Sequence, residues 1–368
     1  MTYGLTADCH FHNWSAFSKQ DAEGINTRLK QMLEEFERLC SMTAISGGRS
    51  LYIAGDIFHV RGTLKTSVFN PVTSHFINCA EKYSLKIYLM PGNHDLEGAE
   101  VTWAGTSVIG MSHDPEHDAQ SVEIILETKI IHEDKVVVVP WQNTREGLTH
   151  EIKNVIEDLR IDREDRAEYD LILHTGINGV ITGMPDHAWN PEDLAAFGFK
   201  RVFSGHYHDH KVFSLPVPGT MTEETQVVSI GSLTHQSWRD VGTKSGWIIV
   251  TDTGFDHHEA ATPKFMDFGS ASDVDEYLGN YVRVKGIEMD EKELIDLRDA
   301  LESAGALGVV VHATPKTKVT SRGTASGKSV KMEESITTWI EASDDIDDDE
   351  EKEVGIAALD VLSEARSI

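Results

Sequence analysis

Short apolar runs that end in polar turns alternate with segments of helical periodicity along roughly the first 255 residues. Apolar side chains between Ile25 and Leu39 recur at steps of three and four residues, which predicts a helix with one apolar face. Residues 66–83, 149–159 and 191–197 show a similar pattern and are also predicted to be helices. The runs predicted to be buried strands are YGLTAD, SLYIAGD, LKIYLMPG, KVVVVPW, DLILHTG, KRVFSGH, VVSIGS and SGWIIVTD.

This alternation predicts an α/β fold in which layered sheets are flanked by helices. A smaller strand–helix–strand pattern follows, then a segment rich in Ser, Thr, Gly and Lys that is typical of a linker, then two short helical pieces. Those two pieces either pack on the parent domain as a hairpin or dock a partner. The expected divisions are residues 1–262 for the main domain, 263–314 for a small α/β domain, 315–331 for the linker and 332–368 for the helical tail.

Composition excludes several classes of protein. No run of about 18 apolar residues is present, so no membrane span is expected, and the first residues lack the basic and apolar regions of a secretion signal. The three cysteines are an odd number without CxxC spacing, so neither a disulfide framework nor a thiolate zinc site is expected. A reducing cytoplasm is therefore the expected location, with Cys40 filling the core from a helix.

The chain is strongly acidic, with a formal net charge of −28. Residues 333–368 hold 13 acidic and two basic residues, whereas residues 315–332 hold five basic and no acidic ones. Because a basic face normally supplies nonspecific attraction to nucleic acid, this balance argues against tight DNA binding by the chain alone.

Carboxylate, imidazole and amide side chains stand at the ends of five predicted strands. Ligands of open α/β sheets bind beyond the carboxyl ends of strands, so we expect these groups to form one site. Carboxylate, imidazole and amide groups suit manganese, iron or zinc, and a carboxylate can bridge two ions, which predicts a two-metal centre. The residues are Asp8, His10, Asp56, His59, Asn93, His94, Asp95, His174, His206 and His208.

The stretches ADCH, GDIFH, GNHD, ILHTG and GHYH, in this order, resemble the five sequence blocks of the calcineurin-like metallophosphoesterases. Within that superfamily the chain is most similar to the SbcD-type DNA-repair nucleases, and in size and tail to the small recombination-endonuclease subunit of tailed bacteriophages. GDIFH and GNHD favour this branch over protein phosphatases, whose blocks usually read GDxxDRG and GNHE. The resemblance implies a metallophosphoesterase β-sandwich with 263–314 as its capping domain.

The resemblance also implies a role for each residue of the site. His94 would face the scissile phosphate and protonate or stabilise the leaving oxygen, Asp95 would orient His94, and His59 would lie just behind the ligands. Of two residues outside the family pattern, His12 is expected on the substrate side or the surface, and Ser232 either caps backbone amides or contacts substrate phosphate. The first ion would be held by Asp8, His10, Asp56 and His208, and the second by Asp56, Asn93, His174 and His206.

The activity implied by the resemblance is manganese-dependent 3′-to-5′ exonuclease and endonuclease cleavage of DNA. The implied partners are a second copy of the chain and an SbcC-type ATPase bound through residues 332–368. One alternative is a stand-alone phosphodiesterase or phosphatase with a small substrate, which would not need the extension at 263–368. Another is a non-enzymatic scaffold with a decayed site, but every ligand position is filled by a competent residue.

Overall fold

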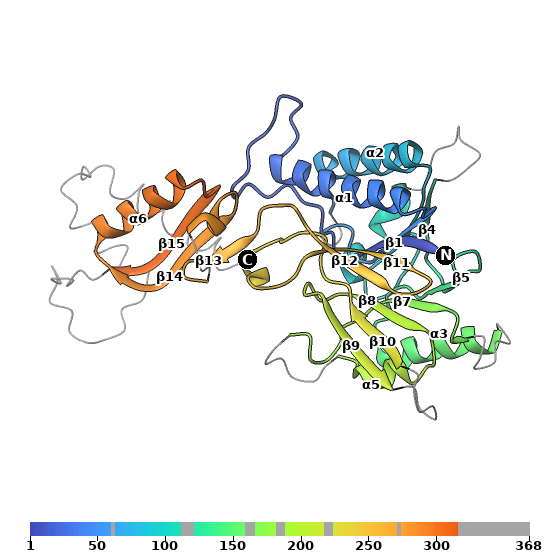
Figure 1. Cartoon of the computed structure of the whole chain (residues 1–368). Helices are drawn as coiled ribbons and strands as arrows, with labels where there is room; N and C mark the ends of the chain where they lie inside the picture. Colours follow the sequence, from blue (N-terminus) through green and yellow to red (C-terminus); the bar gives the residue numbers. More distant parts are fainter. Residues whose placement is uncertain are drawn as a thin grey trace, which may run out of the picture. The chain divides into compact units, whose positions relative to one another are not determined.

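The fold is described from a computed structural model of the chain (Figure 1). The structure describes residues 1–59, 63–111, 121–158, 166–181, 188–216, 224–270 and 274–315. The chain divides into two compact units, Met1–Pro315 and Lys316–Ile368, and only the first contains described residues. The predicted linker and helical tail therefore lie outside the described residues.

One six-stranded sheet carries the amino-terminal strands. Its order is β12-β11-β1-β2-β3-β4, with β1 to β4 parallel to one another and β11 antiparallel to both β1 and β12. The parallel alignment brings the carboxyl ends of β1, β2 and β3 to one edge of the sheet. Its strands are β1 (Thr2–Thr6), β2 (Ser50–Ala54), β3 (Lys86–Met90), β4 (Val122–Ile124), β11 (Gly246–Thr251) and β12 (Phe255–Glu259).

A second six-stranded sheet has the order β5-β6-β7-β8-β10-β9. Strands β6, β7, β8 and β10 are parallel, and the edge strands β5 and β9 are antiparallel to their neighbours. Here too the carboxyl ends of the central strands share one edge. The strands are β5 (Lys129–Ile131), β6 (Val136–Val138), β7 (Asp170–His174), β8 (Arg201–Gly205), β9 (Lys211–Pro216) and β10 (Glu224–Ser229).

Helices cover the outer face of each sheet. The first sheet is covered by α1 and α2, and the second by α3 and α5. The α-helices are α1 (Thr27–Ile45), α2 (Thr66–Tyr83), α3 (Arg145–Asp158) and α5 (Pro191–Ala195), and short 3₁₀ turns are η1 (Asn93–Asp95), η2 (Ser107–Met111), η3 (Trp238–Asp240) and η4 (Val274–Tyr277).

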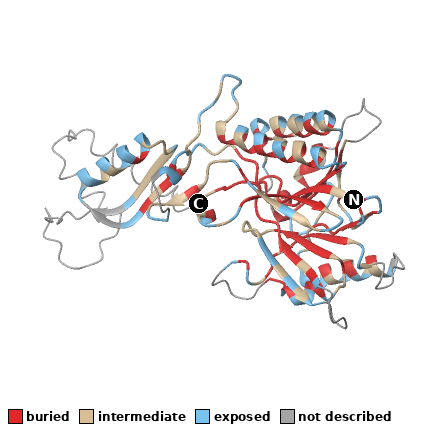
Figure 2. Ribbon diagram, in the orientation of Figure 1, coloured by how far each residue is buried: buried red, intermediate tan, exposed pale blue. Residues whose placement is uncertain are grey.

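Alternation along the strands builds three apolar layers. In β2, Leu51 and Ile53 pack against the helices α1 and α2, whereas Tyr52 and Ala54 face the second sheet. Figure 2 shows the buried residues concentrated along both sheets and on the inner sides of the helices. A fully buried large apolar side chain such as Tyr52 contributes roughly 1.5–3 kcal/mol, so the inter-sheet layer is a major source of stability. The predicted α/β sandwich flanked by helices is confirmed.

A buried ion pair joins the two sheets at the amino ends of their strands. Arg201 donates from Nε and Nη2 to the two carboxylate oxygens of Asp170, at 2.7 and 2.6 Å. The Tyr3 hydroxyl, from the other sheet, donates to the same carboxylate at 2.7 Å. All three side chains are buried, so the paired charges hold each other and Tyr3 in place.

A third sheet and one helix form a small α/β element after residue 264. Its three strands are parallel in the order β13-β14-β15, and Asp290 and Glu293 form a capping box at the start of the helix. It has its own apolar cluster around Val282, Val284 and Leu301. The boundary at 262/263 stays a prediction. The elements are β13 (Phe265–Asp267), β14 (Tyr281–Met289), α6 (Glu291–Ser303) and β15 (Gly308–Pro315).

Among the residues that the structure describes, no helix is long and apolar enough to cross a membrane.

Candidate metal centre

The carboxyl ends of β1, β2, β7 and β8 bring two groups of three metal-ligating side chains together. In each group, one ligand atom per residue lies within 4.8 Å of the others. The groups draw on strands from both large sheets, so the sandwich itself creates the site. The first group is Asp8, His10 and His208, and the second is Asp56, His174 and His206.

In the first group, two imidazoles face each other beside a buried carboxylate. The Nε2 atoms of His208 and His10 lie 3.2 Å apart, and His10 Nε2 lies 3.9 Å from Asp8 Oδ1. Asp8 Oδ1 and His10 Nδ1 are buried without any hydrogen-bond partner in the described part of the chain. Buried polar atoms without partners are costly, so this group fits a cation that is bound between its members.

Beside the second group, the side-chain amide of Asn93 contacts both histidines. Asn93 Oδ1 lies 3.0 Å from His206 Nδ1 and 3.3 Å from His174 Nε2. The His174 Nδ1–H donates to the Ala54 carbonyl at 2.7 Å, which fixes the ring and leaves Nε2 directed at the site. Asn93 therefore lies where the expected amide ligand would be.

Asp56 lies between the two groups. Its Oδ2 is 3.6 Å from His10 Nε2, and its Oδ1 is 3.4 Å from His174 Nε2. One oxygen therefore faces each group, which is the arrangement that a bridging carboxylate needs.

The electrostatics of the metal-free site also favour bound cations. Burial raises the pKa of Asp8 to about 6, although His174 and His208 oppose the shift. Burial disfavours charge on His174 as well, yet Asp56 and Asp8 raise the pKa of His174 to about 9. A buried imidazole thus takes up a proton to balance the carboxylates, which is the charge compensation that metal ions would provide.

Four of the ligand residues occupy the left-handed region of backbone conformation. The φ angles are 49° for Asp8, 46° for His10, 53° for Asp56 and 93° for His206. Non-glycine residues rarely adopt positive φ, and such strain concentrates at functional sites. Asp8 and His10, two residues apart, therefore lie on a tightly turned loop that follows β1 and not on an extended segment.

Position 92 in the GNHD stretch leaves no room for a side chain, so it requires glycine. Its φ is −96°, which any residue can adopt, but a Cβ there would overlap Asp56 Oδ1. The turn of GNHD thus passes directly against the Asp56 carboxylate.

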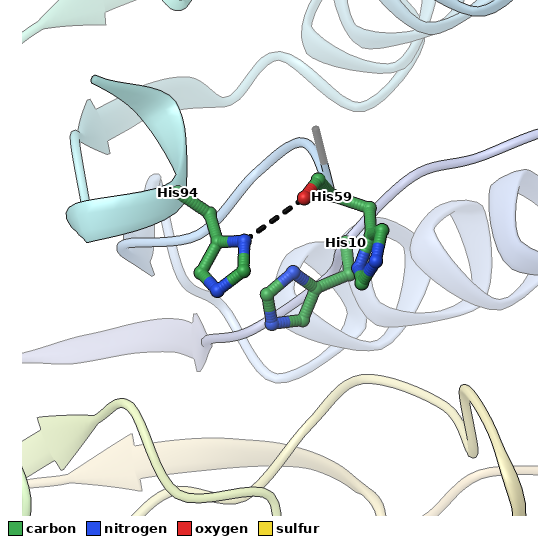
Figure 3. A group of neighbouring side chains, drawn as sticks. All are labelled: His10, His59 and His94. Carbon is green, nitrogen blue, oxygen red and sulfur yellow. Dashed lines mark hydrogen bonds between the residues drawn. The ribbon is translucent and has the colours of Figure 1, made fainter. Parts of the chain in front are cut away.

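A third cluster, His10, His59 and His94, lies beside the first group (Figure 3). The ring of His94 has its centroid 4.9 Å from that of His10 and 5.6 Å from that of His59. The His94 Nδ1–H donates to the carbonyl oxygen of His59 at 2.9 Å. This bond fixes the ring and leaves His94 Nε2 available to a substrate.

Asp95, which was expected to orient His94, forms no hydrogen bond with the His94 ring in the described part of the chain. The Asp95 carboxylate instead accepts from the backbone amides of Ile57, Phe58 and Gly92, at 3.1, 3.0 and 2.9 Å respectively. It thereby joins the GDIFH loop to the GNHD loop and positions His94 only through the backbone. The direct orienting contact comes from the His59 carbonyl, so that detail of the expectation is corrected.

The two tentative substrate residues are buried. Ser232 is fully buried and its hydroxyl donates to the Thr234 carbonyl at 2.9 Å, so it shapes a loop and is not available to substrate phosphate. His12 is 3% exposed, and its Nδ1–H donates to the His10 carbonyl at 2.8 Å. Its ring packs against Trp14, with centroids 4.0 Å apart, so His12 is neither a surface group nor a substrate contact.

Sequence reasoning missed Asp240. Its Oδ1 accepts from His208 Nδ1–H at 2.8 Å, and its Oδ2 accepts from the amides of Gln236 and Ser237, each at 2.8 Å. A carboxylate behind a ligating histidine fixes its tautomer and makes it a better ligand. The stretch SWRD has capping-box spacing, which predicts a helix start, but nothing in that spacing relates Asp240 to His208.

Trp141, which ends the KVVVVPW run, was also missed. Its ring centroid lies 5.5 Å from that of His206 and 5.9 Å from that of His174. An aromatic wall therefore stands beside the second ligand group.

The sequence blocks that supply these groups match a known family. The calcineurin-like phosphoesterase family matches residues 1–210. The chain belongs to this family. Calcineurin-like phosphoesterases are metal-dependent hydrolases with a dimetal centre, and the two groups described above provide the candidate ligands here.

Two solved structures are distantly similar to this chain. A dimetal phosphatase from Danio rerio is 10% identical, with 68% of this chain and 91% of that chain covered and a TM-score of 0.40. The nuclease MPE from Pseudomonas putida is 13% identical, with 69% and 85% covered and a TM-score of 0.29. No curated protein matches the chain. At these distances neither structure carries an argument about the substrate.

Proposed function

We propose that the chain is the manganese-dependent DNA nuclease subunit of an SbcCD-like recombination and repair complex, with 3′-to-5′ exonuclease and endonuclease activity. The observation that favours a nucleic-acid substrate is an aromatic cavity of about 140 Å³ that adjoins His206. Trp141, Trp189 and Tyr207 contribute to its lining. Bases of any sequence stack on such rings, so a nucleotide next to the scissile phosphate has a binding surface.

The proposed chemistry assigns separate tasks to the residues of the site. Two divalent ions held by the two ligand groups would activate water and offset the charge of the phosphate diester. His94 would give a proton from Nε2 to the leaving oxygen, because its Nδ1 is already committed to the His59 carbonyl. Asp95 would keep the loops that carry His94 and Asp56 in register.

The proposed partners follow from the charge of the chain and from its sequence pattern. With a net charge of −28, the chain attracts DNA poorly by itself, so an SbcC-type ATPase subunit would supply much of the binding. We propose that residues 332–368 dock this subunit, and that two copies of the chain act together in the cytoplasm.

One observation favours the alternative, a phosphodiesterase or phosphatase with a small substrate. A larger cavity of about 660 Å³ shares Trp141 with the aromatic one, but Glu100, Glu127 and Glu151 also line it. An acidic wall repels a polyanion that would extend along it. A small phosphate ester would bind at the metal groups alone and would not extend along this wall.

Parallel assays on DNA and on a small diester separate the two functions. The purified chain with manganese should cleave labelled duplex or single-stranded DNA faster than bis(4-nitrophenyl) phosphate. Trp141→Ala should slow DNA cleavage by about tenfold, the effect of one lost stacking contact, and leave nitrophenyl ester hydrolysis unchanged. Trp103→Ala, at a tryptophan that is 72% exposed, is the matched control and should change neither rate. Hydrolysis of the ester without any cleavage of DNA would favour the small-substrate alternative.

A further inference from the structure

A second cluster of metal-ligating side chains lies on the outer helices of the first sheet. Glu37 of α1 and His75 and Cys79 of α2 each offer one ligand atom within 4.8 Å of the others. We propose that these residues, completed by Cys40 of α1, bind one borderline-soft divalent cation of the zinc class. This site shares no residue with the dimetal centre, and the proposal does not depend on the proposed nuclease function.

Helical spacing places the four groups on facing sides of the two helices. His75 and Cys79 are four residues apart on α2, and Glu37 and Cys40 are three apart on α1, so each pair shares one helix face. Beside them the rings of Phe36 and Phe76 stack at 4.0 Å, which fixes the approach of the helices. Two sulfurs, one imidazole and one carboxylate form a donor set that zinc binds tetrahedrally.

Two donor atoms of the cluster have no other task among the described residues. His75 Nε2 is buried without a hydrogen-bond partner. On Glu37, Lys82 Nζ and Tyr83 Oη both donate to Oε1, at 2.6 and 3.1 Å, and neither contacts Oε2. The Glu37 side chain is 31% exposed, so an ion can enter from solvent on its side.

The sulfur of Cys79 is the donor that the geometry places with His75 and Glu37, since one ligand atom of each residue lies within 4.8 Å of the others. A thiol loses its proton when it ligates a metal ion, so binding at this cluster would be coupled to the release of protons.

The other reading of these cysteines is plain core packing, because both belong to the apolar cluster under the helices. Core packing explains the burial of Cys40, which is fully buried, but not the imidazole and carboxylate beside Cys79. The convergence of an imidazole, a carboxylate and a sulfur within 4.8 Å of one another is what distinguishes the cluster from ordinary core.

Cobalt(II) binding to the full chain tests the site. The candidate ligands of the dimetal centre supply only nitrogen and oxygen, so thiolate-to-cobalt charge-transfer absorption in the near ultraviolet would report on the helix site alone. We expect this band in the wild-type chain under reducing conditions, its loss on addition of one equivalent of zinc, and its absence in Cys79→Ser. Cys9→Ala, which removes the third buried cysteine, is the matched control and should retain the band.

A second variant protects the test against a fold defect in Cys79→Ser. His75→Gln keeps both thiols and should weaken zinc binding at least tenfold in competition with a chromophoric chelator, while circular dichroism stays unchanged. His150→Ala, at a histidine on α3, should bind zinc like the wild type. Absence of the band from the wild-type chain with three titratable thiols would overturn the proposal, as would a Cys40–Cys79 disulfide found in place of metal.

Discussion

At the scale of single residues, the His94 ring is restrained at one nitrogen and free at the other. The carbonyl of His59 accepts from Nδ1–H, and the backbone amide of His94 donates to Asp56 Oδ1 at 2.8 Å. The backbone of His94 thus contacts the Asp56 carboxylate, and its ring contacts the loop that carries His59. Neither bond requires the imidazole to act as a metal ligand.

The variant His94→Ala should therefore retain both metal ions and lose strand cleavage. General acid catalysis by a positioned histidine contributes roughly 10²–10⁴-fold, so a loss of that order is expected at saturating metal. Metal counting by mass spectrometry, together with the nuclease assay, checks the two parts separately. Full activity in the variant would refute the assigned role, and loss of metal would make His94 a ligand.

Asp240→Asn should weaken metal binding without displacing a ligand. An amide in place of the carboxylate no longer holds the His208 tautomer as firmly, and the expected cost is roughly 10- to 100-fold in metal affinity. Isothermal titration with manganese measures it. Asp209→Asn is the matched control, because the Asp209 carboxylate bonds the Lys244 amide and no ligand. Equal affinities for both variants would show that Asp240 serves only the loop.

The seven candidate ligand residues could be expected to lie together, because each stands in a short block at the end of a strand. Asp240 could not, since 32 residues separate it from His208 and only tertiary folding brings them together. The side-chain directions of His12 and Ser232 were also beyond reach. Contacts in the folded chain decide both: the His12 ring packs on Trp14, and the Ser232 hydroxyl donates to the Thr234 carbonyl.

At the scale of elements, the two ends of the sheets contain different kinds of interaction. The carboxyl ends hold strained loops and buried carboxylates, whereas the amino ends of β7 and β8 hold the Asp170–Arg201 pair. Arg201 also donates from Nη1 to the carbonyls of Thr251 and Gly254, at 3.0 and 2.7 Å. The pair thus links both sheets at the end away from the candidate metals.

Breaking this pair should be costly. Asp170→Ala leaves the Arg201 guanidinium buried without its counter-charge, for which the expected loss is about 3–5 kcal/mol of unfolding free energy. Asp252→Ala, which removes an exposed ion pair with the terminal amine, is the matched comparison and should cost far less. Urea denaturation of the two variants measures both. Equal losses would mean that the buried pair is not structural.

The predicted bounds of the helices agree best with the structure where the apolar periodicity extends over many residues. The helix predicted at 66–83 is observed as Thr66–Tyr83, whereas the one predicted at 149–159 begins earlier, at Arg145. The first turn of that helix is polar, so the apolar period misses it. Pro71 lies inside α2 and removes one backbone amide donor, yet the helix continues to Tyr83.

At the scale of the whole molecule, the net negative charge is the property that opposes binding of the proposed DNA substrate. The net charge of −28 repels a polyanion over about one Debye length, roughly 8 Å at physiological salt. A local cationic centre therefore does not attract DNA over longer distances. Under the proposed function, attraction to DNA would come from the partner subunit.

The isolated chain should accordingly bind DNA weakly and the complex with an SbcC-type ATPase subunit should bind it tightly. Fluorescence anisotropy with labelled duplex, at several salt concentrations, compares the two. A chain without residues 332–368 should fail to co-purify with that subunit and still hydrolyse the small diester with manganese. Tight, salt-sensitive DNA binding by the chain alone would refute the first expectation, and loss of hydrolysis on truncation would refute the second.

The left-handed conformations at Asp8, His10, Asp56 and His206 have a practical meaning for protein engineering. Substitutions that relieve this strain should raise the melting temperature of the metal-free chain and lower its activity, because the same backbone aims the ligands. A designer who wants a heat-resistant enzyme should leave the carboxyl ends of the strands alone. The amino ends, around Asp170 and Arg201, are where rigidity can be added without touching the chemistry.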